Sequence, residues 1–350
     1  MKTEKINSFG ISTLVLSLCN SAFYGTFSSY IIYKTKTDSF LSIIIGFIIS
    51  LLLSKILLHL FNKYPNKTFI ERNNINKPVI IIYVILLMLT YCFLSLRLST
   101  FLSNQYLINT PNYMILLMII IITLYTSLKG IETITRVSII TFFISLIIFI
   151  FDFISLVPEI NIINFLPFNI TSIKDILETS VLFSIYFTTP IIYLNSFKKN
   201  QISDQSNFNK YYYVMFFSSL IIILLNMFTT IGVSGYHVNS LFDYPIYTTL
   251  KKIHLFSFLD SMENISIMLW VLFIINTCNI NFYFITELVK EKITKNKLVI
   301  YSISLLCFII STFTFNDGFI ETYDYIWLPA IVSLVLIFLQ IICNIKDRLL

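Results

Sequence analysis

Charged residues are scarce in this sequence. Asp, Glu, Lys and Arg make up 12% of its 350 residues, whereas hydrophobic residues make up 57%. Soluble domains carry about 25% charged residues, so roughly half of the usual charge is missing. A soluble fold of this length could not cover its surface with so few polar side chains, whereas a lipid environment does not require them. The composition therefore excludes an ordinary soluble domain and indicates a membrane protein.

Motifs of disulfide frameworks, metal sites and enzymes are also missing. The five cysteines lie inside or at the end of apolar stretches and none belongs to a C-x-x-C pair, so we expect them to act as small hydrophobic residues. The three histidines are scattered, and no Ser-His-Asp spacing, H-E-x-x-H spacing or phosphate-binding glycine loop occurs. The sequence therefore predicts no enzyme activity, no cofactor and no metal.

Basic clusters are missing as well, although the formal net charge is +6. Without a basic stripe, this charge does not predict a nucleic-acid partner. The N-terminus shows no signal-peptide cleavage pattern, because residues 1–7 are polar and lead directly into an apolar stretch.

Long apolar stretches are abundant. A helix needs about 20 mostly apolar residues to cross the hydrocarbon core of a bilayer. The sequence therefore predicts an all-α integral membrane protein with about ten transmembrane helices. Their expected ranges are 9–33, 38–61, 79–104, 112–128, 135–157, 178–196, 211–235, 262–286, 298–315 and 322–344.

Lysine and arginine in the connections predict the orientation of the chain. With the N-terminus inside, 17 of the 24 Lys and Arg residues fall on the inner side, 5 on the outer side and 2 within spans. Short cytoplasmic loops carry an excess of positive charge. We therefore expect an even number of spans, with both termini cytoplasmic.

The first and sixth stretches are the least regular. Asn20-Ser21 and Gly25 lie near the middle of the first, and Thr188-Thr189-Pro190 lies in the sixth. Interruptions at corresponding positions of two halves are typical of inverted repeats, in which the freed backbone groups bind a ligand near the membrane midplane. We predict one transmembrane domain over 1–350, built as a five-plus-five inverted repeat whose halves span about 9–157 and 178–345.

Two outer connections are long, at about 158–177 and 236–261. The second contains an amphipathic stretch from Tyr247 to Phe258. We expect both connections to contain short helices that lie along the membrane surface.

Several local runs occur in an order that is typical of one family. They are Asp38-Ser39-Phe40-Leu41-Ser42; Leu96-Arg97 with Thr110-Pro111; Lys129 to Arg136; Asn164-Phe165-Leu166-Pro167; and Tyr244-Pro245, Ile253, Phe258 to Glu263 and Trp270. Over about residues 8–345 the chain resembles the endospore germination permease family, the B-type integral membrane subunits of spore germinant receptors. Two positions depart from the pattern: Ser261 stands where the family commonly has Arg, and the first span keeps only Gly25 of its usual Gly-rich and Pro-containing character.

The resemblance implies the amino acid permease (LeuT-like) fold of the amino acid–polyamine–organocation transporter superfamily, in which spans one, three, six and eight meet. We expect ligand-binding residues among the hydroxyls, amides and loosened backbone of these spans. The candidates are Asn20, Ser21, Gly25, Tyr91, Ser95, Tyr186, Thr188, Thr189, Asn276 and Thr277. The alternative for each is an ordinary hydrogen bond between helices, which contributes about 0.6 kcal/mol.

Four charged residues are candidates for gating or structural roles. Arg97, late in the third span, could contact a ligand carboxylate or a gating partner, or extend to the outer interface. Glu132 and Arg136 are spaced i, i+4 and predict an ion pair, which acts as a structural clamp or, alternatively, as a coupling-ion site. Glu263 opens the eighth span, where a carboxylate favours the helix N-terminus.

Lys55 and His59 share one face near the inner end of the second span. This position is expected of side chains that extend from a helix to the membrane interface.

The resemblance implies a germinant-sensing subunit in the spore inner membrane or cell membrane. It would bind a small nutrient, such as an amino acid, in a midplane pocket, and its partners would be the A-type and the lipoprotein C-type receptor subunits. An ion-coupled secondary amino acid transporter and a scaffold without a ligand are the alternatives. Asp152 and Glu287 fall near span ends, which disfavours proton coupling through a carboxylate and leaves sodium coupling open.

Overall fold

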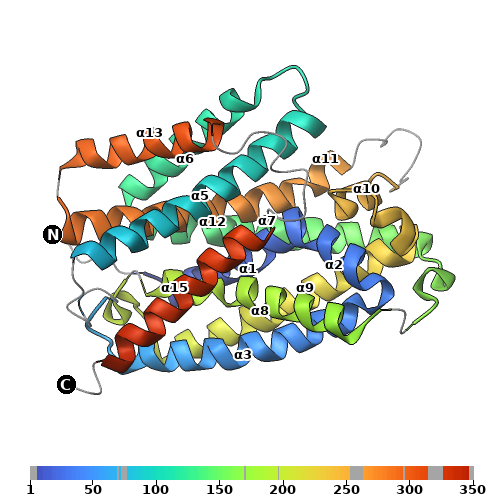
Figure 1. Cartoon of the computed structure of the whole chain (residues 1–350), viewed down its shortest axis with the longest axis horizontal. Coiled ribbons are helices and arrows are strands. Elements are labelled where there is room, and N and C mark those ends of the chain that lie inside the picture. The colour runs from blue at the N-terminus through green and yellow to red at the C-terminus, as the bar shows by residue number, and fades with distance from the viewer. Residues whose placement is uncertain are drawn as a thin grey trace.

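The described structure is helical throughout, and this is the fold class that the sequence predicts. It is a computed structural model that describes residues 6–68, 71, 77–168, 171–195, 197–252, 263–294, 296–313 and 326–346. Within these ranges no strand forms, and the only β-type pairing is an isolated bridge between Ile6 and Ile202. The long helices run side by side as one bundle (Figure 1).

The elements that the structure describes follow one another along the chain as helices. They are α1 Ser8–Ala22, the π-helix η1 Phe23–Phe27, α2 Ser28–Thr35, η2 Lys36–Asp38, α3 Ser39–Lys63, α5 Lys77–Gln105, α6 Asn112–Lys129, α7 Ile131–Leu156, η3 Val157–Glu159, η4 Ile162–Phe165, α8 Ile173–Leu194, η5 Lys199–Gln201, α9 Gln205–Asn239, α10 Pro245–Leu250, α11 Glu263–Ser266, α12 Met268–Lys292, α13 Lys297–Phe313 and α15 Trp327–Lys346.

Seven helical stretches in the described part of the chain are long and apolar enough to cross a membrane. They are Ser28–Lys63, Lys77–Gln105, Asn112–Lys129, Ile131–Glu159, Ile173–Leu194, Gln205–Asn239 and Met268–Lys292, and the shorter apolar helices are Ser8–Ala22, Lys297–Phe313 and Trp327–Ile342. Each of the ten predicted ranges overlaps at least one of these helices, and residues 196, 262, 314–315 and 322–325 of those ranges lie outside the described residues. The chain is therefore a multi-pass, all-α integral membrane protein, whereas the five-plus-five repeat stays a prediction.

Large apolar side chains cover the outside of the bundle. On α7, Ile140, Ile147 and Ile154 are 60%, 68% and 64% exposed and recur every two turns. Water would penalise such a surface, but lipid does not. The exposed stripe therefore marks a face of α7 that contacts the bilayer.

The first predicted span is irregular, as expected, but it is not unwound. Its helix passes from α1 through the π-helical turn Phe23–Phe27 into α2. The backbone N–H of Phe23 donates to the carbonyl of Asn20, so the hydrogen-bond ladder continues into the turn. Gly25 lies inside this turn. π-turns inside α-helices are frequent at functional sites.

The predicted interruption of the sixth span is wrong, because α8 continues through Pro190 as one α-helix. A proline lacks the N–H that would bond the carbonyl four residues earlier. Here that carbonyl belongs to Tyr186, and the hydroxyl of Thr189 donates to it at 2.8 Å. A neighbouring hydroxyl thus replaces the missing donor, which is how membrane helices tolerate proline.

The main break that the sequence reading missed lies in α9 at Gly235, whose φ is 72° and ψ is 158°. Only glycine adopts this backbone conformation readily. The connection after α7 holds the break in place, because the side-chain amide of Asn164 and the backbone N–H of Asn161 donate to the carbonyl of Gly232 at 2.7 and 2.9 Å. Asn239 donates to the carbonyl of Gly235 at 2.8 Å.

Short helices do form in the long connections, as predicted. They are η3 and η4 after α7, and α10 after α9. Their position along the membrane surface stays a prediction. The part of the amphipathic stretch at 253–258 lies outside the described residues.

Candidate functional site

A small internal cavity lies where α1, α5, α8, α12 and α15 meet. Its volume is about 40 Å³, and four predicted ligand residues line it, namely Ser21, Tyr186, Thr189 and Thr277. The other lining residues are Leu18, Ala22, Thr90, Phe93, Leu94, Tyr193, Pro329 and Ser333. Spans one, three, six and eight therefore meet at this cavity, as expected, and α15 joins them as a helix that the sequence reading did not include.

The hydroxyls around the cavity already donate hydrogen bonds. Ser21 donates to the carbonyl of Leu18 at 3.0 Å, and Thr277 donates to that of Phe273 at 2.8 Å. The hydroxyl of Tyr186 donates to the carbonyl of Ile326 at 2.6 Å and thereby joins α8 to the start of α15. Each hydroxyl oxygen keeps lone pairs that can accept a bond from an ammonium or amide group.

The cavity is too small for a nutrient in this conformation. Ligand pockets usually measure about 300–1,000 Å³, whereas this cavity measures about 40 Å³. One water needs roughly 10–15 Å³. The cavity can therefore hold only a few waters until the surrounding helices move apart.

Six predicted ligand residues remain. Of Gly25 the structure describes only the backbone, in the π-helical turn of the first span, and the other five are not among the residues that line this cavity. Tyr91 hydrogen-bonds Thr123 of α6, and Ser95 and Thr188 donate to carbonyls of their own helices, Cys92 and Ser184, at 3.1 and 2.6 Å. The remaining two are Asn276, which belongs to a neighbouring polar cluster, and Asn20, which lies on α1.

Asn276 lies at the centre of that cluster, which joins α12 to α1 and α7. Its side-chain amide lies 3.1 Å from the hydroxyl oxygen of Ser17 and 2.7 Å from that of Thr141. Asn20 donates to the carbonyl of Leu16 at 2.9 Å. The Oδ1 atoms of Asn20 and Asn276 are buried and have no hydrogen-bond donor among the described residues. Buried acceptors of this kind are rare and usually mark a functional or hydrated position.

Asn281 is a polar residue that the sequence reading missed. Its amide donates to the hydroxyl of Thr90, which lines the cavity, at 2.9 Å. Its Oδ1 atom also lacks a described donor. The signal in the sequence was a third asparagine, after Asn276 and Asn279, in an otherwise apolar helix.

Arg97 lies buried against an aromatic cluster. Its side chain is 2% exposed, and its guanidinium lies 4.6 Å from the ring centroid of Tyr244. The Tyr244 ring packs on Phe101 and Trp270 at 4.8 and 5.7 Å between centroids. Arg97 is thus covered by protein in this structure, and both its position relative to the outer interface and its role in gating stay predictions.

The other predicted charges lie at helix ends. Glu132 and Arg136 form the expected ion pair, and both side chains are substantially exposed. Glu263 is the first residue of α11, but its side chain and the preceding run 253–262 lie outside the described residues.

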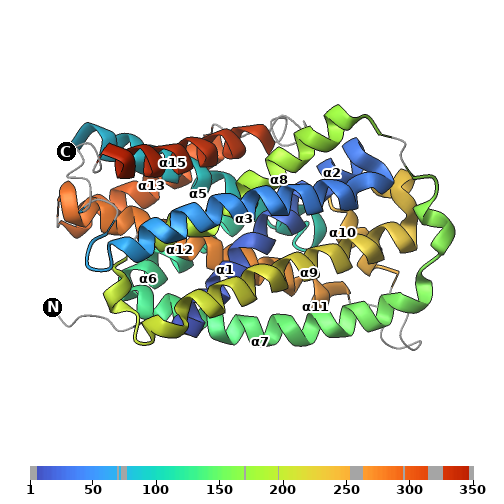
Figure 2. The same cartoon turned by 90° about the horizontal axis from the view of Figure 1, so that it is seen from below.

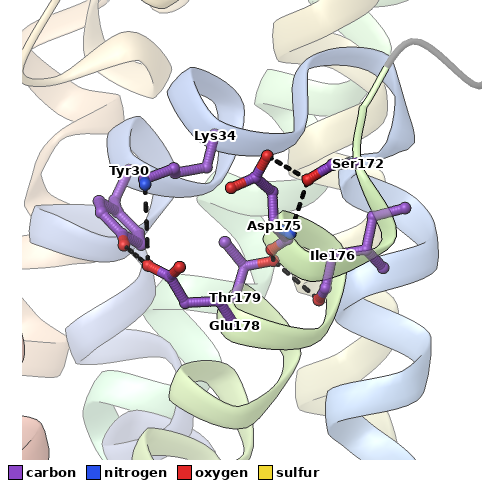
Figure 3. A network of polar contacts seen from close by, with 7 residues as sticks. All are labelled: Tyr30, Lys34, Ser172, Asp175, Ile176, Glu178 and Thr179. Atoms are coloured by element: carbon purple, nitrogen blue, oxygen red, sulfur yellow. Dashed lines mark hydrogen bonds and ion pairs between the residues drawn. The ribbon is translucent and has the colours of Figure 1, made fainter.

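A further polar contact, which the sequence reading did not predict, joins the first and sixth spans. The hydroxyl of Tyr30 donates to Oε1 of Glu178 at 2.5 Å, and Nζ of Lys34 lies 3.8 Å from the same oxygen (Figure 3). Ser172 caps the start of α8 by accepting from the N–H of Asp175 at 3.2 Å. These contacts hold α2 against α8 at the end of the bundle opposite to the chain termini (Figure 2).

The family model described as spore germination protein matches residues 5–320. The chain belongs to this family. It is thus a germination-related membrane protein of a permease or receptor type, as the resemblance of its sequence motifs implied. A comparison with curated proteins returned no match.

Proposed function

We propose that this spore germination protein is the germinant-sensing membrane subunit of a spore germinant receptor. It binds a small nutrient, such as an amino acid, at the cavity between α1, α5, α8 and α12. The observation that carries the proposal is the convergence of Ser21, Tyr186, Thr189 and Thr277 on one cavity in a chain of the germination family.

The small cavity volume supports sensing through a change in conformation. A nutrient that fits only a widened cavity shifts the population toward the open arrangement, because it binds that arrangement more tightly. Tyr186 and Thr277 would meet the ligand from α8 and α12, and the orphaned acceptors of Asn20 and Asn276 lie on the adjoining parts of α1 and α12.

The proposed setting is the inner membrane of the spore, with both termini cytoplasmic. There the A-type and lipoprotein C-type subunits would receive the change in helix arrangement. The distribution of lysine and arginine in the sequence supports this orientation, since an N-terminus inside assigns 17 of the 24 to the inner side.

Binding of amino acids to the full-length protein in lipid nanodiscs tests the proposal. We expect at least one amino acid to bind, and Tyr186→Phe and Thr277→Val each to weaken it by about tenfold, as for a lost hydrogen bond to a charged group. Thr286→Val is the matched control, because Thr286 is a buried threonine of the same helix that bonds the carbonyl of Tyr283 and does not line the cavity.

Two outcomes would contradict the proposal. Equal losses in the control and cavity variants would place binding elsewhere, and no binding of any amino acid would favour a scaffold. Gradient-driven accumulation of the bound amino acid in proteoliposomes would instead show a working transporter.

A further inference from the structure

A second hollow lies on the outside of the bundle between the end of α3 and the start of α9. Its volume is about 470 Å³, and it is lined by Lys55, Ile56, Leu58, His59, Leu60, Asn62, Asn209 and Tyr213. Both helix ends lie at the end of the bundle that carries the chain termini (Figure 2). This groove shares no residue with the cavity of the proposed nutrient site.

The groove lies near the ends of two membrane-spanning helices, where we expect the membrane interface. Lys55 is eight residues before the end of α3, which corresponds to about 12 Å along a helix. Asn209 and Tyr213 lie in the first turns of α9. A lysine side chain at this depth can place its ammonium at the level of the headgroups while its stem stays in the apolar region.

The groove contains two kinds of polar side chain, namely the nitrogen donors of Lys55 and His59 and the amides of Asn62 and Asn209. Lys55 and His59 are exposed and one turn apart, so they present two donors on one helix face. The amide of Asn62 donates to Oδ1 of Asn209 at 3.1 Å. The buried Oδ1 of Asn62 itself has no hydrogen-bond donor among the described residues.

An apolar stripe leads along α3 directly to this groove. Ile44, Ile48, Leu52 and Ile56 recur every turn and are 44%, 55%, 57% and 52% exposed. In a bilayer this stripe faces the acyl chains. A lipid whose tail lies along the stripe would therefore place its headgroup beside Lys55 and His59.

We propose that this groove binds an anionic phospholipid with a hydroxyl-bearing headgroup, such as phosphatidylglycerol. The phosphate lies against the Lys55 ammonium and the His59 ring. The Asn62 side chain turns from its buried position into the groove, so that its Oδ1 accepts a bond from a headgroup hydroxyl. Basic grooves between membrane helices recognise anionic headgroups through the same combination of charge and shape. The bound lipid bridges α3 and α9.

Native mass spectrometry of the full-length protein tests this inference, with phosphatidylglycerol and phosphatidylcholine of identical acyl chains as probes. We expect phosphatidylglycerol to bind preferentially. Lys55→Gln with His59→Gln should lower its affinity by about tenfold and abolish the preference, since the lysine charge and the imidazole donor to the phosphate are both lost. Asn62→Leu should weaken phosphatidylglycerol more than phosphatidic acid, which lacks the headgroup hydroxyls.

Lys297→Gln is the matched control, because Lys297 is an exposed lysine at the start of α13 and does not line the groove. An unchanged preference in the Lys55 and His59 double variant overturns the proposal, as does equal binding of the two lipids by the wild type. Full displacement of the lipid by inorganic phosphate would show a soluble-anion site instead. If the double variant does not fold, Lys55→Gln and His59→Gln singly provide the same comparison.

Discussion

At the scale of single residues, hydroxyl side chains repair or reinforce the helices in which they lie. Thr189 donates to the carbonyl that Pro190 leaves without a partner, and Thr277 donates to Phe273 one turn earlier. The same two hydroxyls line the cavity. A ligand that accepts a hydrogen bond from such a hydroxyl therefore takes that bond away from the helix carbonyl. Ligand binding is in this way coupled to the geometry of the helix.

The first prediction concerns this repair of α8. Thr189→Val should lower the free energy of unfolding by about 1 kcal/mol, because the carbonyl of Tyr186 loses its donor. In a Pro190→Ala background the restored N–H can bond the same carbonyl, so the cost of the valine substitution should shrink. Unfolding of the four variants in detergent measures both costs, and equal costs in the two backgrounds would show that the hydroxyl does not replace the missing N–H.

At the scale of elements, two glycines decide how helices bend and approach each other. Gly235 breaks α9 with a positive φ of 72°. Gly46 lets α3 lie directly on α8, because a Cβ at this position would meet the carbonyl oxygen of Ser180 at 2.5 Å. The first requirement is one of backbone conformation and the second is one of space.

The second prediction separates these two requirements. Gly235→Ala should destabilise the protein by about 1–3 kcal/mol, because the strained conformation is accessible to glycine alone. Steric contact cannot be the cause, since the nearest atom to a Cβ there is Oδ1 of Asn164 at 3.5 Å. Thermal unfolding measures the loss, and a stability equal to that of the wild type would mean that α9 can straighten at no cost.

The third prediction concerns the contact of α3 with α8. Gly46→Ala should separate the two helices and cost about 1–3 kcal/mol, as is typical of overpacking. Ser50→Ala, one turn later on the same buried face of α3, is the control, since it removes atoms and adds none. Detergent unfolding of both variants gives the comparison, and a Gly46→Ala protein as stable as Ser50→Ala would exclude tight packing at this contact.

At the scale of the whole molecule, the structure is closed around its polar interior. Tyr30 and Lys34 hold α2 on Glu178 of α8 at one end, while the cavity between the helices measures only about 40 Å³. Opening the cavity toward that end requires these contacts to break. The contacts of Glu178 are therefore expected to set how often the closed arrangement opens.

The fourth prediction tests this view through Cys19, a buried free thiol of α1. Glu178→Ala should raise the rate of Cys19 alkylation by up to about tenfold, because the closed arrangement loses a charge-assisted hydrogen bond. Peptide mapping after timed alkylation measures the rate. Glu132→Ala, which breaks an exposed ion pair at a helix end, should leave the alkylation rate unchanged. Equal rates in the wild type and both variants would show that the contacts of Glu178 do not control opening.

The sequence by itself was enough to conclude that the protein lies in a lipid bilayer, that its fold is all-α and that it belongs to the germination family. Hydropathy and chain length are properties of a linear sequence, so ten apolar stretches were enough to predict the helices. Family motifs such as Lys129 to Arg136 and Asn164 to Pro167 are local runs and are equally readable. The tertiary structure was not needed for any of these conclusions.

Only the tertiary structure decided which polar residues share a cavity. Ser21, Tyr186, Thr189 and Thr277 line it, whereas Tyr91, in one of the same four spans, bonds Thr123 of α6 instead. The difference depends on how each helix is rotated about its axis and on which neighbour it meets. Apolar residues surround nearly the whole circumference of such helices, so periodicity does not indicate their inner face. For the same reason, Lys55 and His59 appeared only as interfacial side chains until α9 supplied the second wall of their groove.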